Sequence, residues 1–307
     1  MSQLTPDQVI ALLKLGRSLH NAELSSITLE DMVLDYGDFT HAYLRHANLK
    51  RASCQQVNFT EATLILANLS EANLQKACLV NAQLMQAILQ GANLQEVKGS
   101  KVRFFGATLA ETNLAFSDFP YGDFQEVQAP KSNFQQSNLN HAKFNQGNFQ
   151  GACFQDTQLQ QTHWHHTNLQ GASFQEADLQ HALMVGADFT TTNLTQAQLV
   201  SANLSRATFH QSILKDAQLL EATLNAAHFN AAQLVGTSFY GSELESATFE
   251  DLKLENVNLE QTNLENTQWI HVEFDESTQV AGAVLTNAQG LTEAQKDWLR
   301  HRGALNV

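Results

Sequence analysis

The chain contains few cysteines, prolines and basic residues, and each shortage narrows what the protein can be. Its 307 residues include three Cys, three Pro and 17 Lys or Arg, against 31 Asp or Glu. Three scattered cysteines (Cys54, Cys78 and Cys153) cannot form a disulfide framework and indicate reduced thiols in a cytoplasmic protein. A formal net charge of −14 argues against direct binding of nucleic acid.

Motifs for catalysis and for membrane insertion are also missing. The sequence has no P-loop, dinucleotide fingerprint, paired CxxC or HExxH, no secretory signal, and no apolar run long enough to span a bilayer. The densest histidine cluster, His163 to His166, is expected to be solvated, because residues 20 positions away add no metal ligand. We therefore expect no enzymatic activity, no cofactor, no metal site and no membrane association.

What the sequence has in abundance is one repeated unit of five residues. Every fifth position from Leu24 to Phe274 carries Leu, Phe, Trp or Met in 48 of 51 cases, and the exceptions are Cys54, Gly99 and Ala129. A small residue, usually Ala, stands two positions earlier, often with Asn or Asp between. A period of five fits neither a helix nor a continuous strand. It fits a short extended piece followed by a bend, with the small and the large residue both facing inward.

Residues 20 positions apart should stack if four units form one turn of a solenoid. Stacked aromatic rings between adjacent coils are predicted because aromatic residues recur at this spacing in three runs. The 51 units taken in fours make roughly 13 coils, and neighbouring coils should be about 4.8 Å apart. The three runs are Phe189, Phe209, Phe229, Phe249 and Trp269; Phe104, Phe124, Phe144 and Trp164; and Phe134, Phe154 and Phe174.

Tandem Ala-(Asn/Asp)-Leu-x-x units resemble the pentapeptide-repeat family of bacterial proteins. The resemblance covers about residues 22–274. It implies the family's fold, an all-β solenoid in the form of a right-handed quadrilateral β-helix. Some members resemble duplex DNA in shape and charge and protect DNA gyrase, so the resemblance also implies topoisomerase binding as one function. A fold does not by itself confer an activity.

A stack of coils needs a cap at each end, because terminal coils otherwise expose unpaired backbone and core. Thr5-Pro6-Asp7-Gln8 is a helix start with a capping box and predicts an α-helical cap that runs to about Leu19. A second box at Thr292-Glu293-Ala294-Gln295 predicts a helix over about 293–302, with Gly303 as its stop. The expected domains are a capping helix at 1–21, the repeat at 22–276 and a C-terminal cap at 277–307. The alternative is that an end cap mediates homodimerisation or partner binding.

The stretch from Glu96 to Ser132 is the least regular part of the repeat. Gly99 and Ala129 replace large core residues there, and Pro120 and Pro130 remove backbone donors. Because proline cannot donate to a hydrogen-bond ladder, we expect a kink or a protruding loop within 96–132. The alternative is a tolerated defect in a long stack. Three aromatic residues off the core row would be exposed and are candidate partner contacts: Phe105, Phe116 and Tyr121.

Acidic residues are concentrated near the end of the repeat. Residues 241–276 hold ten acidic residues against Lys253 alone. Five glutamates in this segment occupy the same corner position of successive units and therefore form a ring around the coil. This acidic ring either maintains solubility or contacts a partner. Its members are Glu245, Glu250, Glu255, Glu260 and Glu265.

These observations favour a non-enzymatic, cytoplasmic scaffold that binds a protein partner of unknown identity. The alternative is a DNA-mimicking protein that binds and protects gyrase. Duplex DNA carries one charge per about 1.7 Å, so the chain is a thin charge mimic over most of its length.

The inward assignment of every fifth residue is directly testable. Phe209→Asp places an unpaired charge in an aromatic column and is expected to lower the free energy of unfolding by several kcal/mol. A surface change such as Gln170→Ala should leave the free energy of unfolding nearly unchanged. Equal thermal midpoints for the two variants would contradict the assignment.

Overall fold

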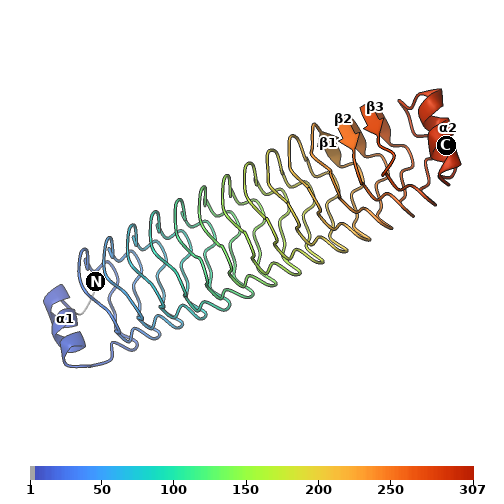
Figure 1. Cartoon of the computed structure of the whole chain (residues 1–307). Coiled ribbons are helices and arrows are strands. Elements are labelled where there is room, and N and C mark those ends of the chain that lie inside the picture. Colours follow the sequence, from blue (N-terminus) through green and yellow to red (C-terminus); the bar gives the residue numbers. More distant parts are fainter. Residues whose placement is uncertain (1–3) are drawn as a thin grey trace. The chain divides into compact units, whose positions relative to one another are not determined.

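The computed structural model describes residues 4–307, and the chain divides into two compact units, one ending at Gln158 and one spanning Leu159–Val307. The described residues include five regular helices and strands (Figure 1). The first unit contains α1 (Pro6–Lys14), and the second contains β1 (His228–Asn230), β2 (Thr248–Leu254), β3 (Gln268–Phe274) and α2 (Glu293–His301). Most other described residues follow a repeating pattern of single bridges and corners.

In the first unit the chain winds into stacked four-sided coils. Parallel bridges join residues that are always 20 positions apart, from Glu23↔Tyr43 to Asn138↔Gln158. Successive bridges are five residues apart along the chain, so four five-residue sides complete one coil. The expected quadrilateral coil is therefore confirmed. Most sides are single bridges rather than strands, because the chain turns a corner within every unit.

The second unit has the same coils, with a change of register near its end. Bridges run at a spacing of 20 from His163↔Leu183, and β1, β2 and β3 form a parallel sheet in this register. After Phe274 the spacing becomes 21, as in Asn258↔Gln279 and Gln268↔Gln289. One extra residue between Phe274 and Val280, the next buried hydrophobic residue, accounts for the change. The coil therefore continues past residue 276, the boundary that the sequence period gave.

The hydrogen bonds of one unit explain its residue pattern. In the unit Ala47–Arg51, the amides of the core residue Leu49 and of Arg51 donate to the next coil, at 2.7 and 2.9 Å. The amide of the outward residue Asn48 donates to the preceding coil at 2.8 Å, and that of Ala47 closes the corner turn. The remaining amide, on the first corner residue Lys50, donates to the side-chain Oδ1 of Asn48 at 3.1 Å. Asn or Asp before the core residue thus satisfies the one amide that has no backbone acceptor.

Within each unit, aromatic rings 20 positions apart stack as predicted. In the first unit the Phe124 ring stacks on Phe104 and Phe144, with ring centroids 5.1 Å apart in each pair, and Phe134 stacks on Phe154 at 4.8 Å. The second unit contains one longer column, whose neighbouring centroids lie between 4.5 and 5.2 Å apart. Offset stacking at these distances adds to the burial of the rings. This longer column consists of Phe189, Phe209, Phe229, Phe249 and Trp269.

The expected kink or protruding loop within 96–132 is wrong. Bridges continue through this stretch without a break, for example Lys98↔Asp118 and Thr108↔Gln128. Pro120 and Pro130 both occupy the first corner position, whose amide takes no part in the backbone–backbone bonds between coils. Their carbonyls still accept from Lys101 and Glu111 at 2.9 Å. Proline is tolerated here because it removes a donor that the ladder does not use.

Gly99 is a second irregularity that the fold absorbs. The Phe119 ring, one coil further on, fills the space that a side chain at Gly99 would need. A Cβ atom at Gly99 would lie 2.5 Å from Phe119 Cδ1 and 2.6 Å from Cε1. Phe119 also packs edge-on against Phe104 and Phe124, with centroids 6.1 and 5.8 Å apart. The missing core side chain is thus replaced by an aromatic ring from the neighbouring coil.

Helix α1 starts as predicted and ends early. The Thr5 hydroxyl accepts from the Gln8 amide, and the Gln8 side chain accepts from the Thr5 amide at 2.8 Å, so the capping box is confirmed. The helix ends at Lys14 rather than near Leu19, and Gly16 follows with φ +63°. Leu19 belongs to the first coil instead, because its amide donates to the Asp38 carbonyl at 2.7 Å.

Helix α2 and its ends match the prediction. Thr292 and Gln295 form the second capping box. Gly303 has φ +87°, and the bonds from Gly303 to Arg300 and from Ala304 to Leu299 form the Schellman motif that ends the helix. Leu299 is buried, and Trp298 packs on Phe274 with ring centroids 5.4 Å apart.

A double-mutant cycle can test whether the Phe119 ring occupies the space that a side chain at Gly99 would need. Gly99→Ala overfills the core and should destabilise the protein by about 2 kcal/mol. In a Phe119→Leu background the same change should be less damaging by about 1 kcal/mol or more, because the two sites share one space. Urea unfolding of the four proteins measures this coupling. Gly91→Asn is the control, since a Cβ at Gly91 meets no atom closer than 3.7 Å. If the two substitutions lower the free energy of unfolding additively, the two sites do not share one space.

Candidate functional site

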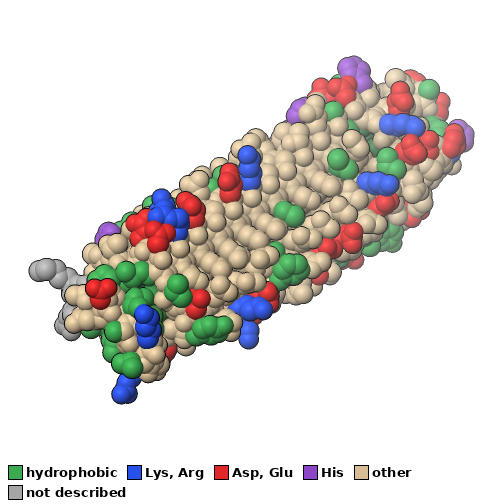
Figure 2. Space-filling model, turned by 60° about the vertical axis from the view of Figure 1, so that its left-hand side comes forward, with side chains coloured by type: hydrophobic (Ala, Val, Ile, Leu, Met, Phe, Trp, Pro, Cys, Tyr) green, Lys and Arg blue, Asp and Glu red, His purple; other side chains and the backbone are tan. Residues whose placement is uncertain are grey.

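The coils display side chains at three places: the outward residue and the two corner residues of each unit. The second corner residue takes a positive φ, for example +62° at Phe116 and +61° at Tyr121, which lets the chain turn within two residues. Figure 2 shows that most of the visible surface carries neither charged nor hydrophobic side chains. Discrete apolar or charged patches therefore stand out from a neutral polar background.

Phe116 and Tyr121 lie at consecutive corners of one coil and are exposed over 52% and 55% of their surface. The Tyr121 ring stacks on His141, with centroids 4.6 Å apart and planes 2° from parallel. Phe105, the third predicted contact, is only partly exposed. These residues project from regular corners, because no loop carries them. We call Phe116, Tyr121 and His141 the aromatic corner patch.

The five glutamates of the acidic ring lie at first corner positions in the second unit. Glu245 and Glu255 are exposed, whereas Glu250, Glu260 and Glu265 are partly buried. Several carboxylates have partners: Glu250 accepts from the Asn230 side chain at 2.6 Å, and Glu255 pairs with Lys253 at 3.1 Å. The hydrogen bond and charge of Glu255 raise the pKa of Lys253.

The histidine cluster is spread around a core tryptophan. Trp164 is buried and donates to the Thr162 hydroxyl at 2.7 Å, while the His163 and His165 ring centroids lie 6.4 Å apart. Over residues 4–307, no three His, Cys, Asp or Glu side chains are grouped to hold a metal ion. Burial raises the pKa of the Cys54 thiol, which points into the coil core as an uncharged group.

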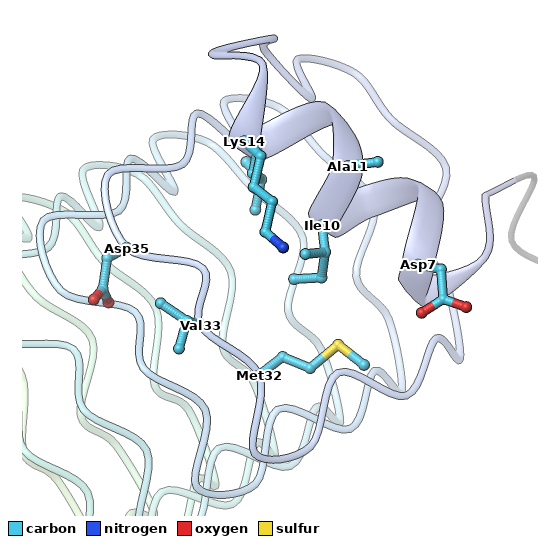
Figure 3. Close-up of a pocket in the computed structure, with 8 residues that line it drawn as sticks. Asp7, Ile10, Ala11, Lys14, Met32, Val33 and Asp35 are labelled. Atoms are coloured by element: carbon cyan, nitrogen blue, oxygen red, sulfur yellow. The ribbon is translucent and has the colours of Figure 1, made fainter.

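A feature that sequence reasoning missed lies between α1 and the first coil. A cavity of about 760 Å³ is lined by Ile10, Leu13, Met32 and Val33, together with Asp7, Ala11, Lys14 and Asp35 (Figure 3). A second cavity of about 330 Å³ shares Leu13 and Asp35 with the first and extends around the corner at Tyr36 to Asp38 on the next coil side. We call the two cavities together the N-terminal groove.

Two family models match the chain over most of its length. The model described as pentapeptide repeats (8 copies) matches residues 18–51, 37–75, 52–91, 67–98, 123–156, 152–190 and 172–211. The model described as pentapeptide repeat region matches residues 207–285. The chain belongs to the pentapeptide repeat family. The right-handed quadrilateral β-helix of this family agrees with the four-sided coils of both units.

Solved structures of other pentapeptide repeat proteins are similar to the chain. HetL, a protein involved in heterocyst differentiation regulation from the cyanobacterium Nostoc sp. strain PCC 7120, is 23% identical over 80% of this chain and 97% of its own, with a TM-score of 0.27. The plasmid-mediated fluoroquinolone resistance protein QnrB1 is 15% identical over 58% and 91%, with a TM-score of 0.35. AT2G44920 from the thylakoid lumen of Arabidopsis thaliana is 24% identical over 45% and 82%, with a TM-score of 0.33. No curated protein matches the chain. The family assignment rests on the family models.

The sequence of the repeat contains a signal that could have predicted the N-terminal groove. Pentapeptide repeats place a small residue and then Asn or Asp before the core residue, but here Met32 and Val33 stand at these positions before Leu34. A large apolar residue in place of the small one, followed by a second large apolar residue, marks a side of the first coil that differs from the regular units. Neither α1 nor α2 is long and apolar enough to cross a bilayer.

Proposed function

We propose that this pentapeptide repeat protein is a non-enzymatic, cytoplasmic scaffold of a bacterial cell that binds a partner protein through fixed surface patches. In this proposal α1 and α2 are the caps of a stack of roughly 13 coils, and they keep the ends from pairing with other coils. The partner is a protein rather than nucleic acid or a membrane.

One observation carries the proposal: the bonds between coils hold the displayed side chains in ordered columns. A corner residue such as Arg51 is held through its own amide and by side chains of the preceding coil, Glu30 and Asp31, at 2.8 and 2.7 Å. The Arg51 hydrogen bond and charge also lower the pKa of Asp31. A surface fixed in this way loses little conformational entropy on binding, which favours recognition by a preorganised partner.

The proposal predicts that the aromatic corner patch contacts the partner protein. Aromatic side chains are enriched where interfaces carry most of their binding energy. Phe116→Ser with Tyr121→Ser should reduce affinity capture of the partner from the native cell at least tenfold, measured by quantitative mass spectrometry. The matched control is Leu66→Ser with Tyr240→Ser, which changes exposed apolar corner residues outside the patch. Equal capture by all three proteins, or no specific capture by the wild type, would refute the proposal.

A second candidate function is protection of DNA gyrase by charge mimicry. The acidic residues of segment 241–276 favour it, because they give this part of the second unit a charge density that the rest of the chain lacks. The solved relative QnrB1 is a fluoroquinolone resistance protein. This second function uses the acidic ring as the surface that faces the enzyme.

The acidic ring can be tested in a gyrase supercoiling assay with a fluoroquinolone. Micromolar protein should restore supercoiling, and replacing all five glutamates of the ring by glutamine should abolish the effect. A charge-matched control replaces five glutamates outside the ring and should retain it. No protection by the wild type removes this candidate. The control positions are Glu71, Glu111, Glu126, Glu176 and Glu221.

A further inference from the structure

The first coil has an open hydrogen-bonding edge on the side that forms the N-terminal groove. Within a stack, the outward residue Ser53 donates its amide to Met32 at 2.9 Å and accepts from Leu34 at 2.7 Å, both in the preceding coil. Val33 is the equivalent residue of the first coil, so its amide and carbonyl point away from the stack. Across residues 4–307 neither group has a hydrogen-bond partner. Together they present one donor and one acceptor, the pattern that a parallel strand satisfies.

The opposite end of the chain shows how such an edge is closed. Residues 303–305 follow α2 and lie along the last coil side as one more strand. The Leu305 amide donates to Ala283 at 2.7 Å, and its carbonyl accepts from Leu285 at 2.9 Å. Gly282 likewise donates to Gly303 at 2.8 Å. At the N-terminal end, α1 lies beside the coil but no residue from 4 to 18 pairs with Val33.

The space above Val33 has the size and lining of a peptide site. A volume of about 760 Å³ lies within the range typical of ligand sites, and its lining combines Ile10 and Leu13 from α1 with Met32 and Val33 from the coil. Figure 3 shows that Lys14 extends toward this space, while Asp7 lies at the far end of α1. Lys14 forms no ion pair in the described chain, whereas Asp35 accepts from Ser53 and from the Gln55 amide at 2.6 and 2.8 Å.

The rim of the groove is unusually apolar for this molecule. Leu15, Tyr36 and Val33 are exposed over 74%, 73% and 66% of their surface, and they are the three most exposed large hydrophobic residues among those described. Tyr36 lines the second cavity, and Leu15 directly follows α1. Exposed apolar side chains gathered around one open edge indicate a surface that is covered in use.

We propose that the N-terminal groove binds an extended segment of a partner protein, which pairs as a parallel strand with Val33. One apolar side chain of this segment enters the space between Ile10 and Met32, and an acidic residue next to it faces Lys14. The mode is β-strand addition, in which main-chain bonds supply affinity and the pocket supplies sequence preference. The inference deepens the proposed scaffold function by naming a second contact and the kind of segment that occupies it.

Fluorescence anisotropy with synthetic peptides tests the groove on the full chain. The probes are labelled eight-residue peptides of alternating Val and Thr with a central Leu, followed by Glu, Gln or Lys. The Glu peptide should bind most tightly, and Lys14→Glu should reverse the order of the Glu and Lys peptides. Val33→Pro removes the edge amide and should raise the Kd about tenfold, the loss of one main-chain hydrogen bond. Thr28→Pro, at an equivalent edge position outside the groove lining, should leave the Kd unchanged within about twofold.

A second variant fills the cavity and leaves the backbone of the coil unchanged. Ala11 lines the cavity from the exposed face of α1, so Ala11→Trp should block the peptides while the thermal midpoint stays unchanged. No binding by any peptide, or equal loss with Val33→Pro and Thr28→Pro, would overturn the proposal. A dimer in light scattering that Ala11→Trp dissociates would also overturn it, because a second copy would then be the occupant. The scaffold function survives these failures if the aromatic corner patch still captures a partner.

Discussion

The fold depends on the regular hydrogen bonds that the backbone of each five-residue unit forms with the neighbouring coils and across its own corner. Four amides of a unit have backbone acceptors, two in the next coil, one in the preceding coil and one across the corner. In units with Asn or Asp before the core residue, that side chain accepts from the fifth amide two residues later, as in Lys50 with Asn48. Because buried backbone groups must be paired, this scheme fixes the period of five. Close packing inside the coil then selects the small and the large inward residue of each unit.

The same scheme limits where the protein can bind other molecules. The inward residues fill the coil, and in the described chain no buried side-chain nitrogen or oxygen lacks a partner. Recognition is therefore left to corner residues and to the ends of the coil stacks, where the ladder stops. The aromatic corner patch and the acidic ring use corner positions, whereas the N-terminal groove uses the first coil. The first two are variations on positions that every unit possesses, whereas the groove also needs α1 and the open edge of the first coil.

Sequence reasoning succeeded where it depended on the repeat and failed where it considered residues one at a time. Pro120 and Pro130 predicted a break, because proline lacks an amide donor. Only the assignment of hydrogen bonds shows that the first corner amide is not needed between coils. Gly99 also suggested a defect, but the ring that fills its place comes from Phe119, 20 residues later. Helix α1 ended early because Leu19 satisfies the core position of the first coil.

The sequence by itself determined the four-sided coil, its aromatic columns and both helix starts, because these follow from spacing and from local capping. The tertiary structure decided which irregularities are compensated and which surfaces stay open. The N-terminal groove is the clearest case, since it combines α1 with Met32 and Val33 of a coil. An unpaired edge is a property of neighbouring chain segments, and a strictly regular period does not specify which neighbour is missing.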